Sequence, residues 1–325
     1  MGFSSDCGNK CGTRSFFPHV ITLVQAALIA SMIFYFDVYS YASSEAMRGS
    51  VILLILHFAN RLILCHYSGR LGKIAQRLSN LKLIEENGFD KLNCLLVIFC
   101  IVYCLVNIAL TTARAIGSDG SVPILVTTIL ANVFQHIFFL IIGNILMIFF
   151  ISVCHDIEQV IKSYRRFSMT QPIPDYRCLV RGYLSVRKLV LEVDSQMYGM
   201  VFCALATIMF ICYFGLIAIA KPDELSYLEI VGSCFSAAYN ALIFLLACFW
   251  ANRVSSSAES VAEEAHCLEK NPENSLVTYI CYLNVVNQDL CMTAWGFLPL
   301  RKNFVLATVG TLITYSVLIK NFSKN

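Results

Sequence analysis

Charged residues are scarce in this sequence. Asp, Glu, Lys and Arg make up only 14% of its 325 residues, whereas hydrophobic residues make up 58%. A soluble domain cannot hide that much apolar surface, so the composition excludes an ordinary globular protein. The ten-residue alternation typical of a transmembrane β-barrel is also missing. The composition therefore predicts an all-α membrane protein, because a helix satisfies its own backbone hydrogen bonds in lipid.

The sequence also lacks the motifs of common enzyme classes. It has no Gly-x-Ser-x-Gly, no His-Glu-x-x-His, no phosphate-binding loop and no dinucleotide-binding glycine pattern. Cys7 and Cys11 have no nearby His or Cys that would complete a zinc site. None of the 15 cysteines falls in a predicted external loop, which argues against a disulfide framework. We therefore expect no enzymatic activity, no bound metal and no cofactor.

Long apolar segments account for the hydrophobic composition. A helix needs about 20 apolar residues to cross the hydrocarbon core of a bilayer. The fourth segment is longer than one crossing requires, so its helix is expected to continue into the cytosol. The second segment is short and contains His57, Asn60 and Arg61. The seven predicted spans are residues 19–36, 51–67, 92–112, 123–153, 197–220, 227–250 and 303–322.

Lys and Arg residues are distributed unevenly between the loops. With a cytoplasmic N-terminus, the cytoplasmic segments contain 18 of these residues and the external segments contain four. Cytoplasmic loops of membrane proteins carry the excess of positive charge, so this distribution places the N-terminus inside the cell. A G-protein-coupled receptor has the opposite orientation. The net charge of +3 follows from this topology and gives no reason to expect nucleic-acid binding.

Two segments between the spans have helical patterns of their own. A break at residues 171–174, which read Gln-Pro-Ile-Pro, is followed by apolar residues at helical spacing, so spans four and five are expected to project beneath the membrane. Residues 276–290 predict an amphipathic helix that ends before Gly296 and Pro299. Its apolar stripe is buried either within its own subunit or at a subunit interface. The stripe comprises Leu276, Tyr279, Ile280, Leu283, Val286 and Leu290.

The last thirty residues carry the most specific pattern in the chain. Thr293 begins the run Thr-Ala-Trp-Gly-Phe-Leu-Pro, in which Gly296, Phe297 and Pro299 stand out, and the final span ends with Thr314, Tyr315, Asn321 and Phe322. This arrangement resembles insect gustatory receptors, whose last span has Thr-Tyr, five mostly apolar residues and then Gln-Phe, after a segment like Thr-Ala-Cys-Gly-Phe-Phe-Pro. Asn321 replaces the Gln, Trp295 replaces the Cys, and Lys320 lies in the normally apolar stretch.

The resemblance implies a function and an assembly. It implies a subunit of a ligand-gated, non-selective cation channel for contact chemosensation, in the plasma membrane of chemosensory neurons, with a small-molecule tastant as ligand. Such receptors look like tetramers, of one or several related subunits, held by cytoplasmic helices around a pore lined by the last span. The chain then divides into a cytoplasmic N-terminus (1–18), a sensing bundle (19–250), a linker with an anchor helix (251–302) and a pore helix, split from the anchor helix, with a short external end (303–325).

Thr311, Thr314, Leu318 and Asn321 share one face of the last span by helical spacing. On the channel hypothesis, a ring of Leu318 side chains forms an apolar constriction that gates by dewetting, and Asn321 offers amide oxygens to a cation at the mouth. Periodicity alone leaves the alternative that Leu318 faces lipid or packs in the core of its own bundle, and that Asn321 caps a helix end. Tyr315 is expected to point off this face by roughly 100° and to pack against neighbouring helices.

A ligand pocket would lie between helices in the outer half of the bundle. Polar side chains within spans rarely face lipid, so those at this depth are expected to point inward. Hydrogen bonding between helices is the alternative explanation for each of them. The outer half lacks an Asp or Glu cluster and is rich in Phe, Tyr and Leu, which favours an apolar or mixed ligand over a sugar. The candidates are Tyr103, Asn107, Thr128, Asn132, Gln135, Tyr213, Ser236 and Tyr239.

Two other functions are compatible with seven spans. A metabotropic seven-helix receptor would place the N-terminus outside the cell. A non-conducting partner subunit would tune other chemoreceptors, and Lys320 favours this alternative because a positive ring beside the mouth repels cations. We expect Lys320 to extend instead to the external headgroups.

Overall fold

The computed structural model describes residues 88–116, 126, 141–170, 175–220, 226–267 and 276–322, with scattered helical positions between 55 and 76. The first predicted span, 19–36, and most of the first half of the fourth lie outside the described residues. The described elements are α3 (Gly88–Ile116), α5 (Ile141–Thr170), α6 (Tyr176–Ala220), α7 (Tyr227–Cys267), α8 (Leu276–Val286), β1 (Thr293–Ala294), β2 (Leu298–Pro299) and α9 (Lys302–Phe322).

The protein is an all-α membrane protein with helices much longer than a bilayer is thick. Among the described residues, α3, α5, α6 and α7 each contain a stretch long and apolar enough to cross a membrane. The 45 residues of α6 and the 41 of α7 extend for roughly 60 to 70 Å at a rise of about 1.5 Å per residue. Because the hydrocarbon core is only about 30 Å thick, about half of each helix lies outside it.

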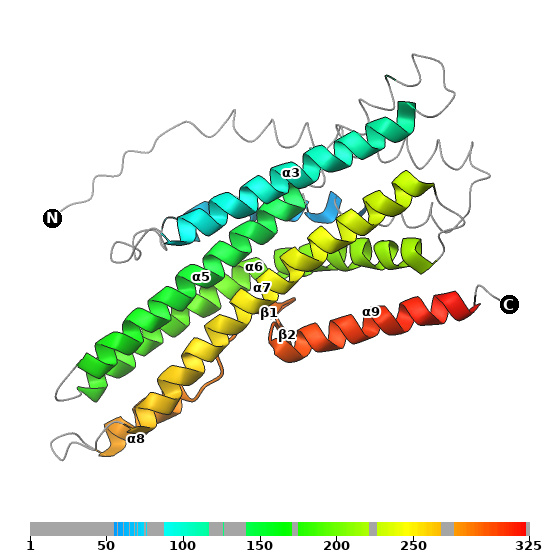
Figure 1. Ribbon diagram of the computed structural model, residues 1–325. Coiled ribbons are helices and arrows are strands. Elements are labelled where there is room, and N and C mark those ends of the chain that lie inside the picture. Colours follow the sequence, from blue (N-terminus) through cyan, green and yellow to red (C-terminus); the bar gives the residue numbers. More distant parts are fainter. Residues whose placement is uncertain are drawn as a thin grey trace, which may run out of the picture.

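The three longest helices form the centre of the molecule. Helix α6 packs against α5 and α7, α3 covers α5 and α7, and α8 lies against α6 and α7. Figure 1 shows α5, α6 and α7 running side by side along the length of the bundle. Helices α6 and α7 approach each other closely at Gly215, where a Cβ atom would lie 2.3 Å from that of Ala237. In the second predicted span, Asn60 is 1% exposed and donates a hydrogen bond to Thr207 of α6 at 2.9 Å.

The predicted helical extensions of spans four and five are confirmed, and their cytoplasmic location stays a prediction. Helix α5 continues to Thr170, and α6 begins at Tyr176 after the Pro-containing break. Asp175 caps α6, because its Oδ1 accepts hydrogen bonds from the backbone N–H groups of Arg177 and Cys178 at 3.0 and 3.4 Å. Helices α5 and α6 are therefore continuous from the predicted spans into the predicted cytoplasmic segment.

Five tyrosines join these extensions to α8. Tyr164 of α5 donates to the carbonyl oxygen of Leu179 at 3.0 Å and lies 3.4 Å from the hydroxyl of Tyr282. Tyr183 of α6 donates to the carbonyl oxygen of Val286. Burial raises the pKa of Tyr164, Tyr183 and Tyr282, so all three stay neutral donors in the cytosol. The tyrosine cluster is Tyr164, Tyr176, Tyr183, Tyr279 and Tyr282.

One detail of the sequence prediction for α8, the position of its C-terminal end, is wrong. The helix ends at Val286 rather than near Leu290, and its buried side chains are Tyr279, Tyr282 and Val286. Leu276 and Ile280, which belong to the predicted apolar stripe, are 59% and 47% exposed. The tyrosine cluster explains the difference, because ring packing with α5 and α6 rotates the helix toward Tyr282.

Candidate functional site

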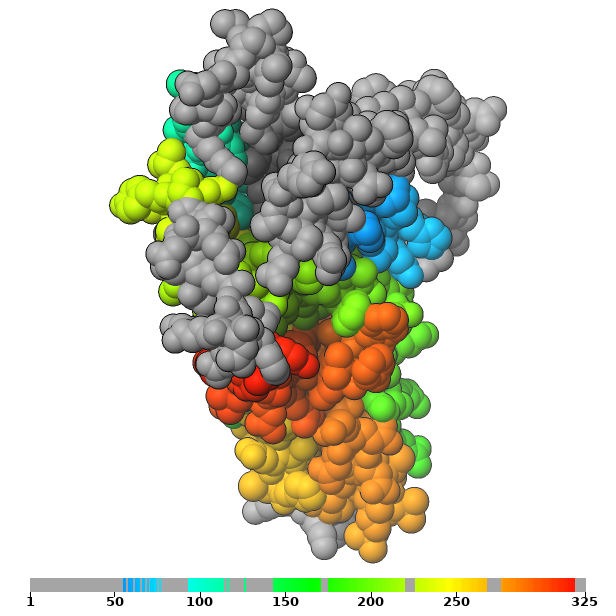
Figure 2. All heavy atoms as spheres, turned by 90° about the vertical axis from the view of Figure 1, so that its right-hand side faces the viewer, coloured from blue at the N-terminus to red at the C-terminus, as the bar shows by residue number. Residues whose placement is uncertain are grey.

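The last helix, α9, is scarcely buried by its own subunit. None of its described side chains, residues 302–318, is buried, and Leu306 and Tyr315 are 72% and 58% exposed. By contrast, α3 exposes one apolar face but buries the opposite one, where Tyr103 is 1% exposed. Figure 1 shows α9 leaving the bundle toward its C-terminal end, and Figure 2 shows α8 and α9 on the same face of the molecule.

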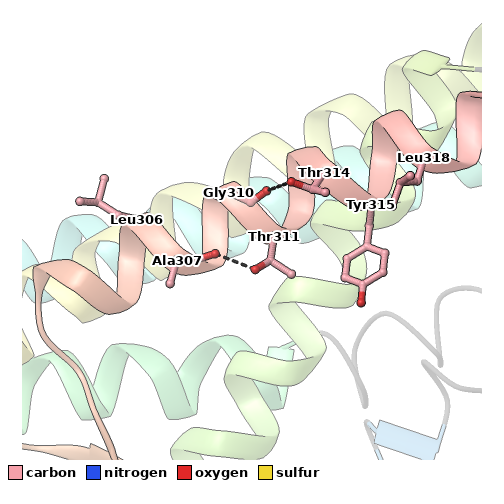
Figure 3. A pocket seen from close by; sticks show the side chains of 7 residues that line it. All are labelled: Leu306, Ala307, Gly310, Thr311, Thr314, Tyr315 and Leu318. Carbon is pink, nitrogen blue, oxygen red and sulfur yellow. Dashed lines mark hydrogen bonds between the residues drawn. The ribbon is translucent and has the colours of Figure 1, made fainter.

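A groove runs along α9 and holds most of the predicted pore face. Its volume is about 610 Å³, and its lining side chains among the described residues come from α9 itself. Tyr315, predicted to point off this face, also lines the groove, on the same side of α9 as Thr311 (Figure 3). The side chains of Asn321 and Phe322 lie outside the described part of the chain. The lining residues are Leu306, Ala307, Gly310, Thr311, Thr314, Tyr315 and Leu318.

The threonine hydroxyls of this groove bond to their own helix. Thr311 donates to the carbonyl oxygen of Ala307, and Thr314 donates to that of Gly310, both at 2.8 Å (Figure 3). Each hydroxyl oxygen keeps its lone pairs for another donor or a cation. Leu318 is 42% exposed at the far end of the same groove. The groove therefore combines hydroxyl oxygens with an apolar side chain one turn beyond them.

Half of the predicted ligand residues come together between α3 and α7. Ser236 donates to Oδ1 of Asn107 at 2.9 Å, and the rings of Tyr103 and Tyr239 stack with centroids 3.9 Å apart. Asn240 completes the group by donating to the hydroxyl of Tyr103 at 3.2 Å. Sequence reasoning missed Asn240, although it lies one helical turn after Ser236 and faces the same way. These side chains hold α3 against α7, as expected if they serve hydrogen bonding between helices rather than ligand binding.

The described ring contacts of Tyr213 lie elsewhere, and the other three pocket candidates are not described. Tyr213 lies on α6 beside Phe210 and Phe214 of the same helix. Thr128, Asn132 and Gln135 lie outside the described residues, so their grouping with the other candidates stays a prediction.

A short hairpin connects α8 to α9. Strands β1 and β2 pair antiparallel, with Thr293 opposite Pro299. Trp295 and Gly296 at the tip both have positive φ, 59° and 77°. The hairpin rests on α6 through Asp194, whose carboxylate accepts two hydrogen bonds from Thr293. Burial raises the pKa of Asp194, against the opposing effect of these two bonds, and the residue lies below the predicted cytoplasmic end of span five.

A buried carboxylate marks the cytoplasmic end of the bundle. Glu158 of α5 is 1% exposed, and its Oε1 accepts a hydrogen bond from Nε of Arg253 on α7 at 2.9 Å. Nζ of Lys162 lies 2.8 Å from the same oxygen. Arg253 also stacks over Trp250, 5.1 Å from the ring centroid. This network ties α5 to α7 where both helices leave the predicted membrane region.

Comparison with known proteins gives a fold but no close relative. No protein-family model and no curated protein matches the sequence. The structure of insect olfactory receptor OR5 from Machilis hrabei in complex with eugenol matches with a TM-score of 0.72 at 11% identity, covering 99% of this chain and 93% of that one. A second structure of the same receptor matches with a TM-score of 0.61 at 14% identity, covering 98% and 93%. The chain has the fold of an insect olfactory receptor.

Proposed function

We propose that this protein, which has the fold of an insect olfactory receptor, is a subunit of a ligand-gated, non-selective cation channel for contact chemosensation. The gustatory rather than olfactory role rests on the C-terminal motifs, which resemble those of insect gustatory receptors. The protein acts in the plasma membrane of chemosensory neurons and forms a tetramer, alone or with related subunits.

The unburied groove of α9 carries this proposal. An apolar transmembrane helix that buries no described side chain in its own subunit has its partners in lipid or in other subunits. In a tetramer, four such grooves face a common axis. Leu318 then forms the apolar constriction, and Thr311 and Thr314 line the wider part with hydroxyl oxygens. Opening separates the four α9 helices and wets the constriction.

The ligand is a small, largely apolar molecule that binds in the outer bundle. The olfactory receptor with the same fold was solved in complex with eugenol, a small aromatic compound. The stacked rings of Tyr103 and Tyr239 and the polar pair of Asn107 and Ser236 supply matching chemistry. The ligand favours the open state to the extent that it binds this state more tightly.

Truncation of Leu318 tests the pore assignment. Leu318→Ala is expected to raise ligand-independent current severalfold, because a shorter ring keeps the constriction wet. Val309→Ala is the matched control, since Val309 is 41% exposed and lies on the opposite side of the helix. The measurement is whole-cell current in transfected cells, with eugenol as the first compound of a panel of small aromatic ligands. Equal effects of the two substitutions contradict the pore assignment.

Two controls separate the alternatives. A protein that gives no current alone, but changes the ligand response of a co-expressed conducting relative, is a partner subunit, as Lys320 favours. An N-terminal epitope tag stained on intact cells indicates the orientation of a metabotropic receptor. We expect staining only after permeabilisation, because 18 of the Lys and Arg residues lie on the side of the N-terminus.

A further inference from the structure

The contact between Asp194 and Thr293 joins the longest helix of the bundle to the segment that precedes α9. Oδ1 of Asp194 accepts the backbone N–H of Thr293 at 2.6 Å, and Oδ2 accepts its hydroxyl at 2.7 Å. Both carboxylate oxygens are therefore used by one residue. Hydrogen bonds to an ionised acceptor are about twice as strong as neutral ones, so this pair is the strongest polar link between α6 and the hairpin.

Two further contacts follow on the same face of α6. The N–H of Trp295 donates to the carbonyl oxygen of Tyr198 at 3.1 Å. The indole ring of Trp295 packs edge-on against Phe202, with centroids 4.2 Å apart. Asp194, Tyr198 and Phe202 are spaced by four residues, so they form one stripe along three successive turns. The hairpin is thus held along about 12 Å of α6.

The shape of the hairpin depends on these contacts. Trp295 has a φ of 59°, which is uncommon for any residue with a side chain and unfavourable for a bulky one. Such a conformation persists only where the surroundings fix it. Gly296, at a φ of 77°, continues the turn against the ring of Tyr198, 3.9 Å from where a Cβ would lie. Loss of the α6 contacts therefore releases a strained turn.

The hairpin in turn sets the direction of α9. Leu300 is 1% exposed, and its N–H donates to the carbonyl oxygen of Met292 at 3.0 Å, which closes the hairpin. The N–H of Lys302 donates to Asn252 of α7 at 3.3 Å. Beyond this first turn no described side chain of α9 is buried. The angle of α9 is accordingly set near its base, by the hairpin on α6 and by α7, where the ring of Phe304 also packs against that of Phe244.

We propose that Asp194 is a positioning residue whose contact with Thr293 makes α6 and α9 move together. Helix α6 is continuous from Asp194 to Tyr213 in the outer bundle, so a tilt produced by ligand arrives at the base of α9. Without the pair, the ligand still binds but no longer moves α9. This inference rests on the proposed function, because it assigns the route by which ligand binding opens the pore.

The first test compares substitutions at both ends of the contact. Thr293→Val removes the hydroxyl and keeps the shape, and Asp194→Ala removes both acceptors. Asp194→Ala is expected to raise the ligand concentration for half-maximal current by about tenfold, within the usual range of coupling between two sites. Thr293→Val should raise it by less, because the backbone N–H at position 293 still donates to Oδ1 of Asp194. Thr293→Ser keeps both bonds and should behave like the unmodified protein. The double variant should be no worse than Asp194→Ala alone, because both changes remove the same interaction.

A second measurement reports the coupling without any current. The chain has two Trp residues, so Trp250→Phe leaves Trp295 as the single indole, in the hairpin itself. In purified Trp250→Phe protein, eugenol or another bound panel compound should shift the Trp295 emission. The shift should persist in Thr293→Ser and be smaller in Thr293→Val, while ligand affinity measured by calorimetry stays unchanged.

The two measurements separate the possible failures. One possible result is a Trp295 emission shift that depends on the Thr293 hydroxyl, in a protein that conducts no ions. This result supports the coupling and contradicts the proposed channel function. A Trp295 signal that is the same in Thr293→Val and Thr293→Ser overturns the coupling role of Asp194, whether or not current is present. A bound ligand that leaves Trp295 unchanged in the unmodified hairpin overturns it as well.

Discussion

At the scale of single residues, the buried carboxylate of Glu158 is the most sensitive point of the cytoplasmic half. It is 1% exposed and has Arg253 and Lys162 as cationic partners. Removing one partner of a buried charge leaves that charge without compensation, and this outweighs any gain from the pair itself. Arg253 contributes two nitrogen contacts and a stacked ring, whereas Lys162 contributes one nitrogen.

We therefore predict that Arg253→Ala destabilises the protein by about 1.5 to 3 kcal/mol, discounted from the fully buried case because the Arg253 side chain is 40% exposed. Lys162→Ala should cost less than about 1 kcal/mol, because Lys162 is 32% exposed, contributes only one nitrogen contact and lies one turn from Glu158 on the same helix. The melting temperature of the detergent-purified protein, followed by size-exclusion chromatography after heating, distinguishes the two. Equal losses of stability in the two variants would mean that Glu158 depends on Arg253 no more than on Lys162.

The polar side chains between α3 and α7 show what can be predicted from the sequence of a membrane bundle. Tyr103, Asn107, Ser236 and Tyr239 are predicted to point inward because polar side chains avoid lipid, and they do meet between α3 and α7. The rule states which side chains face inward but not which of them touch. Asn240 follows the same rule and was missed because depth alone did not separate it from the rest of span six.

At the scale of elements, the crossing of α6 and α7 depends on one glycine. A Cβ at Gly215 would lie 2.3 Å from the Cβ of Ala237 and 3.1 Å from the carbonyl oxygen of Ser233. Neither neighbour is a flexible side-chain end, so the helices themselves would have to separate. At Gly199 of the same helix, an added Cβ would meet nothing within 4 Å.

Gly215→Ala is thus expected to destabilise the protein by about 1 to 3 kcal/mol through overpacking, whereas Gly199→Ala should be neutral or stabilise it by up to about 1 kcal/mol through helix propensity. Adding Ala237→Gly to the Gly215→Ala variant removes the nearest clash and should recover much of the loss. Thermal stability in detergent is the measurement. A destabilised Gly199→Ala with an unaffected Gly215→Ala would contradict this packing.

Long helices were easier to predict than the junctions between them. Apolar length and the proline break at 171–174 are local signals, and α5, α6 and α7 follow them. The hairpin after α8 has no such signal. Trp295 is an unfavourable residue at positive φ, and only its tertiary contacts with Tyr198 and Phe202 keep it there. The end of α8 was missed for the same reason, because Tyr282 is drawn inward by rings on α5 and α6.

At the scale of the whole molecule, two unburied apolar surfaces lie on one face. Helix α9 exposes its groove, and below it α8 exposes Leu276, Val277 and Ile280, which are 59%, 75% and 47% exposed (Figure 2). The α9 surface lies at membrane depth, but α8 lies in the predicted cytosol, where lipid cannot cover it. Apolar side chains gathered in water indicate a protein contact. We therefore expect neighbouring subunits of the proposed tetramer to cover the α8 surface.

This arrangement predicts that α8 holds the assembly. Ile280→Glu should convert tetramers into smaller species in detergent, because a charge at a buried contact costs several kcal/mol per subunit. Ile280→Val keeps the surface apolar and should leave the tetramer intact. Leu184→Glu is the second control, because it places the same charge on a similarly exposed residue, 43%, of the cytoplasmic part of α6. Mass photometry of the purified proteins measures the subunit number directly.

The comparison decides between the two interpretations of the amphipathic helix. If only Ile280→Glu dissociates the protein, then the helix uses its tyrosine face for its own subunit and its aliphatic face for its neighbour. Burial within the own subunit and burial at a subunit interface then apply to opposite sides of one helix. Tyr279 and Tyr282 are buried in their own subunit, whereas Val277 and Ile280 are exposed. An unmodified protein that is already monomeric would remove the basis for a shared pore at α9, because no neighbour would then complete the groove.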